Sequence, residues 1–244
     1  MPQSVMEAID VVKFLGDGAG RVQALKGVSI SLAGGELALL MGPSGSGKST
    51  LLSILGCVMS PSEGAIRVCG HSTEGLSAEE FAELRRKYIG FVFQSYRLFP
   101  TLTALDNVRL ALDVRGERFR AFKRAREALA TVGLAHKINA LPRELSGGEQ
   151  QRVAIARAIV AKPAVILADE PTAALDSENG HSVVSLLAKI ADRPDCGVLV
   201  VTHDPRTLPF ADRIIRIEDG HLVDQGQDTD AARYLVSSER PRPC

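Results

Sequence analysis

One stretch near the start of the chain limits the possible folds more than any other. Residues 42–50 fit the phosphate-binding pattern G-x-x-x-x-G-K-[ST]. The apolar run at residues 37–41 predicts a buried strand before this loop, and the run at residues 51–55 predicts a helix after it. The order strand, glycine-rich turn, helix predicts a site for a nucleoside triphosphate.

Each residue type in this loop has a chemical reason to be there. The loop residues are Gly42, Pro43, Ser44, Gly45, Ser46, Gly47, Lys48, Ser49 and Thr50. Because glycine has no Cβ, the backbone N–H groups can approach a phosphate closely, and the following helix adds the positive end of its dipole. We expect Lys48 to reach the β- and γ-phosphates and the Ser49 hydroxyl to bind Mg²⁺.

The composition narrows the class of protein. A chain of 244 residues with 45% hydrophobic residues predicts one large domain, or one domain with a subdomain. Lys+Arg and Asp+Glu are both 29, and this balance argues against nucleic acid as a partner. No apolar run is long enough for a membrane span, residues 1–4 do not look like a signal peptide, and the four cysteines lack metal-type spacing. Reduced thiols in a cytosolic protein are expected.

The strand patterns predict an α/β fold. Apolar and serine residues alternate at residues 28–32, which indicates a half-exposed antiparallel strand. The run at residues 164–168 is continuously apolar, as a central parallel strand requires, and residues 198–202 predict a second buried strand. Residues 88–93 predict a further strand, and residues 214–223 a hairpin. We therefore expect a mainly parallel sheet with an N-terminal antiparallel part.

Helical periodicity dominates residues 95–148, which predicts an inserted helical subdomain. One apolar face is expected to contain Phe119, Phe122, Ala125, Leu129 and Val132, with Gly133 ending the helix. The opposite face carries a basic group: Arg118, Arg120, Lys123, Arg124 and Arg126. A solvated helix face is the favoured interpretation of this group, and contact with anionic lipid headgroups is the alternative.

Polar residues follow three of the predicted strands, at Gln94, at Asp169 and Glu170, and at His203. Ligands bind at the carboxyl ends of parallel strands, so these side chains should meet at the phosphate loop. Asp169 could hold Mg²⁺, and Glu170 could deprotonate the attacking water. Gln94 could touch the metal or that water, and His203 could contact the γ-phosphate.

A second predicted anion site lies at Ser146, Gly147, Gly148 and Glu149, where a helix begins. One triphosphate does not need two such sites on one chain. This predicts a head-to-tail homodimer in which the phosphate loop of one copy faces Ser146 of the other, with two ATP molecules between them.

Taken together, these motifs closely resemble the ATP-binding subunit of ABC transporters, over nearly the whole chain. The resemblance assigns residues 42–50 to Walker A, Gln94 to the Q-loop and residues 145–150, LSGGEQ, to the signature. It assigns residues 165–170 to Walker B with Glu170 as catalytic residue, residues 174–176 to the D-loop and His203 to the switch histidine. Other stretches, such as residues 168–177, resemble the branch of macrolide, lipoprotein and glycolipid exporters (MacB, LolD and DevA types).

The resemblance implies an ATPase that powers a separate membrane permease for export or for lipid or lipoprotein extraction. ATP and Mg²⁺ would be its cofactors. The resemblance also suggests a periplasmic adaptor as a further partner. The chain would lie in the cytoplasm, peripheral to the inner face of the cell membrane through its permease. Its ATP-binding domain would span residues 1–232, with a nucleotide-binding core at about 1–94 and 160–232, a helical subdomain at about 95–159 and a flexible tail at 233–244.

Some interpretations remain open at this stage. An ATP-driven signalling module of the cell-division type, which regulates a periplasmic enzyme without transport, would use the same motor chemistry. Phe14 could stack on adenine or belong to the core. Permease docking is expected around residues 94–107, where Tyr96, Leu98 and Phe99 could line a groove or pack the subdomain core.

Overall fold

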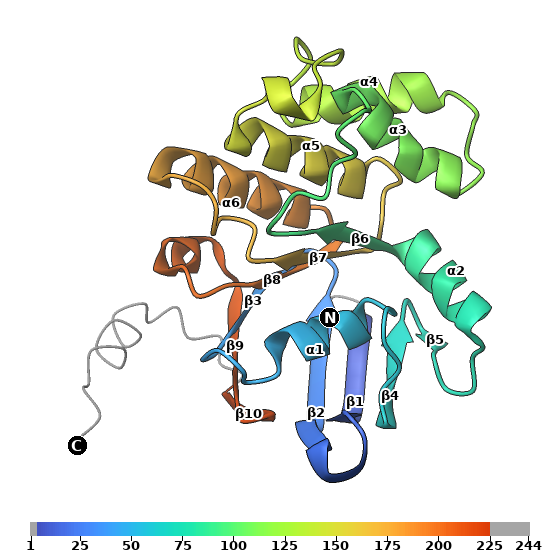
Figure 1. Ribbon diagram of the computed structural model, residues 1–244, viewed down its shortest axis with the longest axis vertical. Coiled ribbons are helices and arrows are strands. Elements are labelled where there is room, and N and C mark those ends of the chain that lie inside the picture. The colour runs from blue at the N-terminus through green and yellow to red at the C-terminus, as the bar shows by residue number, and fades with distance from the viewer. Residues whose placement is uncertain (1–3, 225–244) are drawn as a thin grey trace.

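The computed structural model describes residues 4–224, which form two sheets and the helices around them (Figure 1). The first sheet is antiparallel, with strand order β2-β1-β4-β5. Its strands are β1 (Ser4–Leu15), β2 (Val22–Ala33), β4 (Glu63–Val68) and β5 (His71–Ser72). In β2 the side chains of Val28, Ile30 and Leu32 are buried and the serines between them are exposed, as the alternation predicts.

The second sheet has six strands in the order β10-β9-β3-β8-β7-β6. They are β3 (Leu37–Met41), β6 (Ile89–Val92), β7 (Val165–Asp169), β8 (Gly197–Val201), β9 (Arg213–Glu218) and β10 (His221–Asp224). Only β10 is antiparallel to its neighbour, which confirms the mainly parallel sheet and the C-terminal hairpin. The central strands β3 and β8 are buried at every position, because helices or the other sheet cover both faces.

The helices are α1 (Lys48–Leu55), α2 (Ala78–Tyr88), α3 (Ala104–Val114), α4 (Ala121–Thr131), α5 (Gly147–Ile159) and α6 (Ser177–Ala191). Short 3-10 turns lie at Gly18–Gly20, Pro142–Glu144 and Pro205–Phe210. Helices α3, α4 and α5 lie between β6 and β7 in the chain and form a separate layer above the parallel sheet (Figure 1). None of the helices within residues 4–224 combines the length and apolar character that a membrane crossing requires.

Two apolar clusters hold these layers together, one on each face of the parallel sheet. Side chains alternate along β3, so Leu37, Leu39 and Met41 pack into one cluster while Ala38 and Leu40 pack into the other. The first cluster joins the sheet to α3, α4, α5 and α6, and the second joins it to α1 and the antiparallel sheet. The helical layer is thus attached to the sheet through a continuous apolar core.

The structure differs from the sequence predictions at the apolar face of α4. Phe119 is 79% exposed and Phe122 is 51% exposed, so neither belongs to the core. The helix begins only at Ala121, which leaves Phe119 outside it, and Phe122 lies about 100° around the helix from the buried Ala121. The buried stripe consists instead of Ala121, Ala125, Ala128 and Leu129. A smaller difference is that α2 extends through Tyr88, so β6 begins at Ile89.

A substitution at Leu39 tests whether packing of the central strand β3 stabilises the fold. Leu39 lies on β3, which is paired with both β8 and β9, and its side chain is fully buried in the first cluster. Leu39→Ala should lower the free energy of unfolding by about 3 kcal/mol, because the cavity left behind cannot collapse completely. Urea unfolding measures this change, with Val58→Ala, at a 62% exposed position, as control. Equal effects of the two substitutions on the free energy of unfolding would contradict the burial of Leu39 in the core.

Candidate nucleotide-binding site

The carboxyl ends of β3, β6, β7 and β8 open into one cavity of about 1050 Å³. The predicted site residues that line it are Gly42, Pro43, Ser44, Gly45, Gly47, Lys48, Ser49, Thr50, Gln94, Asp169, Glu170 and His203. Ser46 lies behind this lining, where it is buried. The topology therefore brings together side chains that are up to about 160 positions apart in the chain, as the strand-end rule predicts.

The phosphate loop depends on glycine at two positions with left-handed backbone. Gly45 has φ +82°, and Gly47, which caps α1, has φ +103°. A Cβ on Gly47 would also lie 2.7 Å from the Ala24 carbonyl oxygen. The loop places the Lys48 ammonium 2.8 Å from the Gly42 carbonyl oxygen and 2.7 Å from that of Pro43, to which it donates. Lys48 is thereby held over the loop, at the end of the cavity where α1 begins.

Electrostatic effects couple Lys48 to the two carboxylates across the cavity. Burial lowers the pKa of Lys48, and the charges of Glu170 and Asp169 oppose this change. Burial raises the pKa of Asp169, the nearby Glu170 carboxylate raises it further, and Arg97 and Lys48 oppose the rise. A carboxylate whose charge is destabilised by burial and by a neighbouring carboxylate favours a bound cation.

The donors present fit a magnesium ion. Ser49 supplies a hydroxyl, Asp169 a carboxylate and Gln94 an amide oxygen, and all three line the same cavity. Mg²⁺ prefers such oxygen ligands and keeps part of its water shell, so a few protein donors suffice. The raised pKa of Asp169 adds a second reason, because a cation there would offset the cost of the buried charge.

Glu170 is held in a strained and well-defined position. Its backbone has φ +46°, unusual for a residue other than glycine, and its N–H donates to the Val201 carbonyl oxygen at 2.9 Å. Its Oε1 lies 2.8 Å from Nδ1 of His203, and Oε2 is buried with no hydrogen-bond partner among residues 4–224. The second oxygen therefore keeps its acceptor capacity unused among the described residues.

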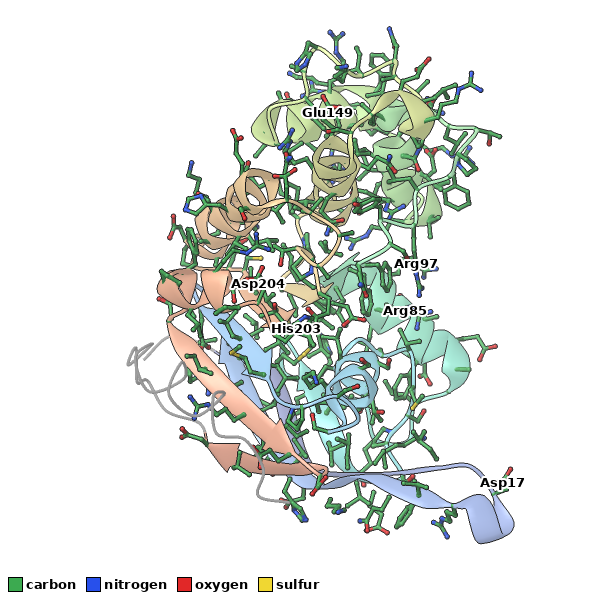
Figure 2. All side chains as sticks on the ribbon, turned by 60° about the vertical axis from the view of Figure 1, so that its left-hand side comes forward. Asp17, Arg85, Arg97, Glu149, His203 and Asp204 are labelled. Atoms are coloured by element: carbon green, nitrogen blue, oxygen red, sulfur yellow. The ribbon has the colours of Figure 1, made fainter. Side chains whose placement is uncertain are left out.

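The residues at the start of α5 do not reach this cavity. Ser146, Gly147, Gly148 and Glu149 are absent from its lining, and Glu149 lies in the helical layer, well away from His203 (Figure 2). They form a capping box instead. The Ser146 hydroxyl accepts from the Glu149 N–H at 3.2 Å, and the Glu149 carboxylate accepts from the Ser146 N–H at 2.8 Å. Within one copy, the second anion site and the phosphate loop remain apart.

Gly148 lies against the segment that begins α6. A Cβ on it would fall 2.3 Å from Oδ1 of Asn179, so no larger residue fits without a shift. Asn179 is itself fixed by Asp176, which caps α6 and accepts from its N–H at 2.9 Å and from its side chain at 2.7 Å. The signature segment is therefore packed directly against the D-loop segment.

The position of Phe14 does not match the predicted stacking of its ring on adenine. Its ring lies 3.9 Å from the Arg21 guanidinium carbon, and it does not line the cavity. Side chains alternate along β1, so the next residue, Leu15, lines the cavity in its place. Leu15 is paired with Val22, another lining residue, at the end of the β1–β2 hairpin. The geometry gives no support to adenine stacking by Phe14.

Several residues near the site had no signal in the sequence. Leu15, Val22 and Lys26 line the cavity but match no motif. Two side chains of α5 also contact site segments. Gln151 donates to the Pro171 carbonyl oxygen at 2.9 Å, just after Glu170. Arg157 donates to the carbonyl oxygens of Tyr96 at 2.8 Å and Arg97 at 2.5 Å, just after Gln94. These contacts depend on which face of α5 each side chain occupies and on which segment packs against that face, so they are seen only in the tertiary structure.

Comparison with known proteins agrees with this geometry. Residues 25–173 match the protein family described as "ABC transporter". The chain is 45% identical to the macrolide export ATP-binding/permease protein MacB 1 of Aeromonas hydrophila, over 91% of this chain and 34% of that protein. It therefore spans about a third of the length of the MacB relatives that it matches.

Two further similarities extend over nearly all of the matched protein. The chain is 45% identical to the lipoprotein-releasing system ATP-binding protein LolD of Bordetella pertussis, over 89% of this chain and 94% of that one. It is also similar to the dimeric structure of the ATP-binding cassette MJ0796 in a post-hydrolysis state with ADP and Pi. That match has a TM-score of 0.82 and 42% identity, and it covers 91% of this chain and 97% of the other. Since the family match alone covers more than half of the chain, the chain belongs to the ABC transporter family.

Proposed function

We propose that this chain hydrolyses Mg²⁺-bound ATP between two of its copies and passes the resulting motion to a membrane permease. The observation that carries this proposal is the meeting of Lys48, Asp169, Glu170 and His203 in one cavity at the carboxyl ends of the parallel strands. A phosphate-binding loop, a carboxylate for a metal and a general base are the parts that phosphoryl transfer to water requires.

Glu170 is the proposed general base. Its carboxylate would accept a proton from the attacking water, and the hydrogen bond between Oε1 and His203 would hold that carboxylate in place. His203 fixes the orientation of the carboxylate, and Gln94 lies within the same cavity, where it could sense the water or the metal. Lys48 would exchange its two loop carbonyls for phosphate oxygens. Bound Mg²⁺ would neutralise charge on the phosphates.

The two-copy site is proposed because the signature segment is not used within one copy. Its N–H groups and capping serine lie at the exposed end of α5, away from the cavity. A head-to-tail pair would bring this helix N-terminus to the phosphates held by the other copy. The similar MJ0796 cassette is dimeric with ADP and Pi, which supports this arrangement.

Glu170→Gln tests both the base and the dimer. Glutamine keeps the shape of the side chain but cannot take a proton, so ATP turnover should fall by roughly 10²–10⁴-fold while ATP binding persists. Because hydrolysis no longer separates the copies, the variant with ATP should elute as a dimer in size-exclusion chromatography. The same variant with ADP is the control and should elute as a monomer. Undiminished turnover, or a monomer at saturating ATP, would contradict the proposal.

The nucleobase is proposed to lie against Leu15 and Val22. These residues are 37% and 63% exposed at the end of the β1–β2 hairpin, and no Phe, Tyr or Trp among residues 4–224 lines the cavity. Aliphatic side chains offer contact area without directed hydrogen bonds or stacking. The chain should therefore discriminate weakly between ATP and GTP.

Leu15→Tyr should tighten ATP binding by about fivefold, because an aromatic ring adds stacking on the base. Leu15→Ser should weaken it by a similar factor, since the apolar contact is lost. Equilibrium binding of a fluorescent ATP analogue measures both changes. Val223→Tyr, at an exposed position outside the cavity, is the control and should change nothing. If neither Leu15 variant alters the affinity, the base lies elsewhere.

The permease is proposed to dock in a second hollow of about 530 Å³, between α2, β6 and α3. Its apolar lining includes Phe91, Phe93, Phe99, Leu110 and Val114, and Arg85 and Arg97 lie together at its side (Figure 2). Two of its lining residues, Arg97 and Phe99, belong to the stretch at residues 94–107 where docking is expected. Leu98, however, packs against the buried core, so Phe99, 50% exposed, is the better candidate for contact. A short apolar helix of the partner would suit this groove.

Phe99→Glu should leave basal ATP turnover and the melting temperature unchanged, because the side chain is half exposed in the isolated chain. It should abolish co-purification of the permease from detergent-solubilised membranes, since a charge enters an apolar contact. Val223→Glu provides a matched charge at another exposed valine. Retention of the permease by Phe99→Glu, or its loss with Val223→Glu, would rule out this groove.

The cargo is proposed from the relatives. MacB is a macrolide export protein and LolD belongs to a lipoprotein-releasing system, so export or extraction of an apolar or lipid-linked cargo is the proposed role. A periplasmic adaptor would be a further partner of this kind of system. These names do not favour the signalling alternative. Attachment to the inner face of the membrane through the permease would follow from the same proposal.

A further inference from the structure

The turn into α4 exposes an unusual surface, which we name the basic aromatic patch. It consists of Arg118, Phe119, Arg120, Phe122, Lys123 and Arg126, all of them exposed. Phe119 is the most exposed large apolar side chain in the described part of the chain, at 79%, and Phe122 reaches 51%. Neither ring is needed by the core, which is filled at this helix by Ala121, Ala125, Ala128 and Leu129.

Cations accompany both rings of the patch. The Arg120 guanidinium lies 5.0 Å from the centre of the Phe119 ring, and that of Arg126 lies 5.9 Å from the centre of the Phe122 ring. Each pair thus presents an apolar ring and a positive charge side by side at the surface. Arg120 has φ +53° at the cap of α4, so the backbone turns sharply between the two rings.

Two neighbouring arginines, Arg115 and Arg124, form hydrogen bonds with the protein itself. Arg124 pairs with Glu117 at 2.6 Å and donates to the Val160 carbonyl oxygen, and Arg115 donates to the carbonyl oxygens of Lys87 and Ala161. These two side chains therefore hold the turn onto the protein. The exposed residues from 118 to 127 contain four cations and one carboxylate, Glu127, which lies 3.8 Å from Lys123. In a chain with equal numbers of acidic and basic residues, this is a local surplus of positive charge.

We propose that the basic aromatic patch binds the surface of a membrane that contains anionic lipids. At that surface the phosphates would pair with the exposed cations, and the phenyl rings would enter the layer between headgroups and acyl chains. Guanidinium and ammonium groups keep contact with headgroups while an apolar neighbour is buried, so rings and cations can be accommodated together. A folded nucleic acid would satisfy the cations but would leave the isolated rings in water.

The place of the patch in the fold agrees with this proposal. It lies on the α3–α4 connection at the outer edge of the helical layer, on the side where α2 lies (Figure 1). The preceding residues, Val114 and Arg115, line the groove proposed for the permease. The contact would therefore orient the chain beside a membrane partner, but it requires neither that partner nor ATP.

Vesicle sedimentation of the whole chain tests the patch without nucleotide or permease. The probes are vesicles of phosphatidylcholine alone and of phosphatidylcholine mixed with phosphatidylglycerol. The chain should sediment with the mixed vesicles only, and less so as salt is raised. The triple substitution Arg118→Gln, Arg120→Gln and Arg126→Gln should lower this partitioning by about a hundredfold. Phe119→Ser with Phe122→Ser should lower it by at least about tenfold.

A matched triple variant separates the patch from net charge. Arg67→Gln, Arg143→Gln and Lys189→Gln remove the same charge at exposed positions on other parts of the surface and should leave partitioning unchanged. All variants should keep the melting temperature and basal ATP turnover, because none of these residues lies in the core or the cavity. No preference for mixed vesicles, equal loss in both triple variants, or binding of RNA in place of vesicles would overturn the proposal. So would vesicle binding that survives in both patch variants.

Discussion

The parallel hydrogen-bonded register of β3, β8, β7 and β6 is the constraint on which the rest of the structure depends. Leu40 is paired with Val201, Asp169 also with Val201, and Val92 with Ala168, so these strands stop at nearly the same level. The polar residues that follow them therefore emerge at one edge, around the phosphate loop. A shift of one residue in any strand would turn its side chains to the opposite face and remove its polar end from the cavity.

Helix α5 connects the parts of this site mechanically. Its first turn presents the signature segment, Gln151 in its second turn holds the segment after Glu170, and Arg157 near its end holds the segment after Gln94. Tyr96 and Arg97, the residues held by Arg157, both have left-handed backbone, at φ +56° and +47°. Such conformations are costly for side chains other than glycine and persist only where the surroundings enforce them. A movement of α5 against the sheet would therefore be felt at Gln94 and Glu170 together.

The surfaces of the chain divide by chemistry. The cavity at the strand ends has both polar and apolar lining, the groove beside α2 is largely apolar, and the turn into α4 combines rings with cations. The signature end of α5 faces away from the cavity of its own copy. These separate surfaces allow nucleotide, second copy, permease and membrane to be engaged at the same time, because none of the proposed contacts uses residues of another.

The sequence by itself determined the α/β fold, the strand ends and the motif residues, because the phosphate loop, the LSGGEQ segment and the apolar strands are local patterns with strong physical requirements. Only the tertiary structure decided whether the phenylalanine side chains at 14, 119 and 122 lie in the cavity, in the core or at the surface. Alternation along β1 puts Leu15, not Phe14, in the cavity. The late start of α4 leaves Phe119 outside the helix, and Phe122 lies on its exposed side. It also decided the contacts of Gln151 and Arg157, whose hydrogen bonds are buried or part-buried and which follow the LSGGEQ segment in α5. Local patterns report period and composition, whereas the partner of a side chain depends on packing between segments that are distant in the chain.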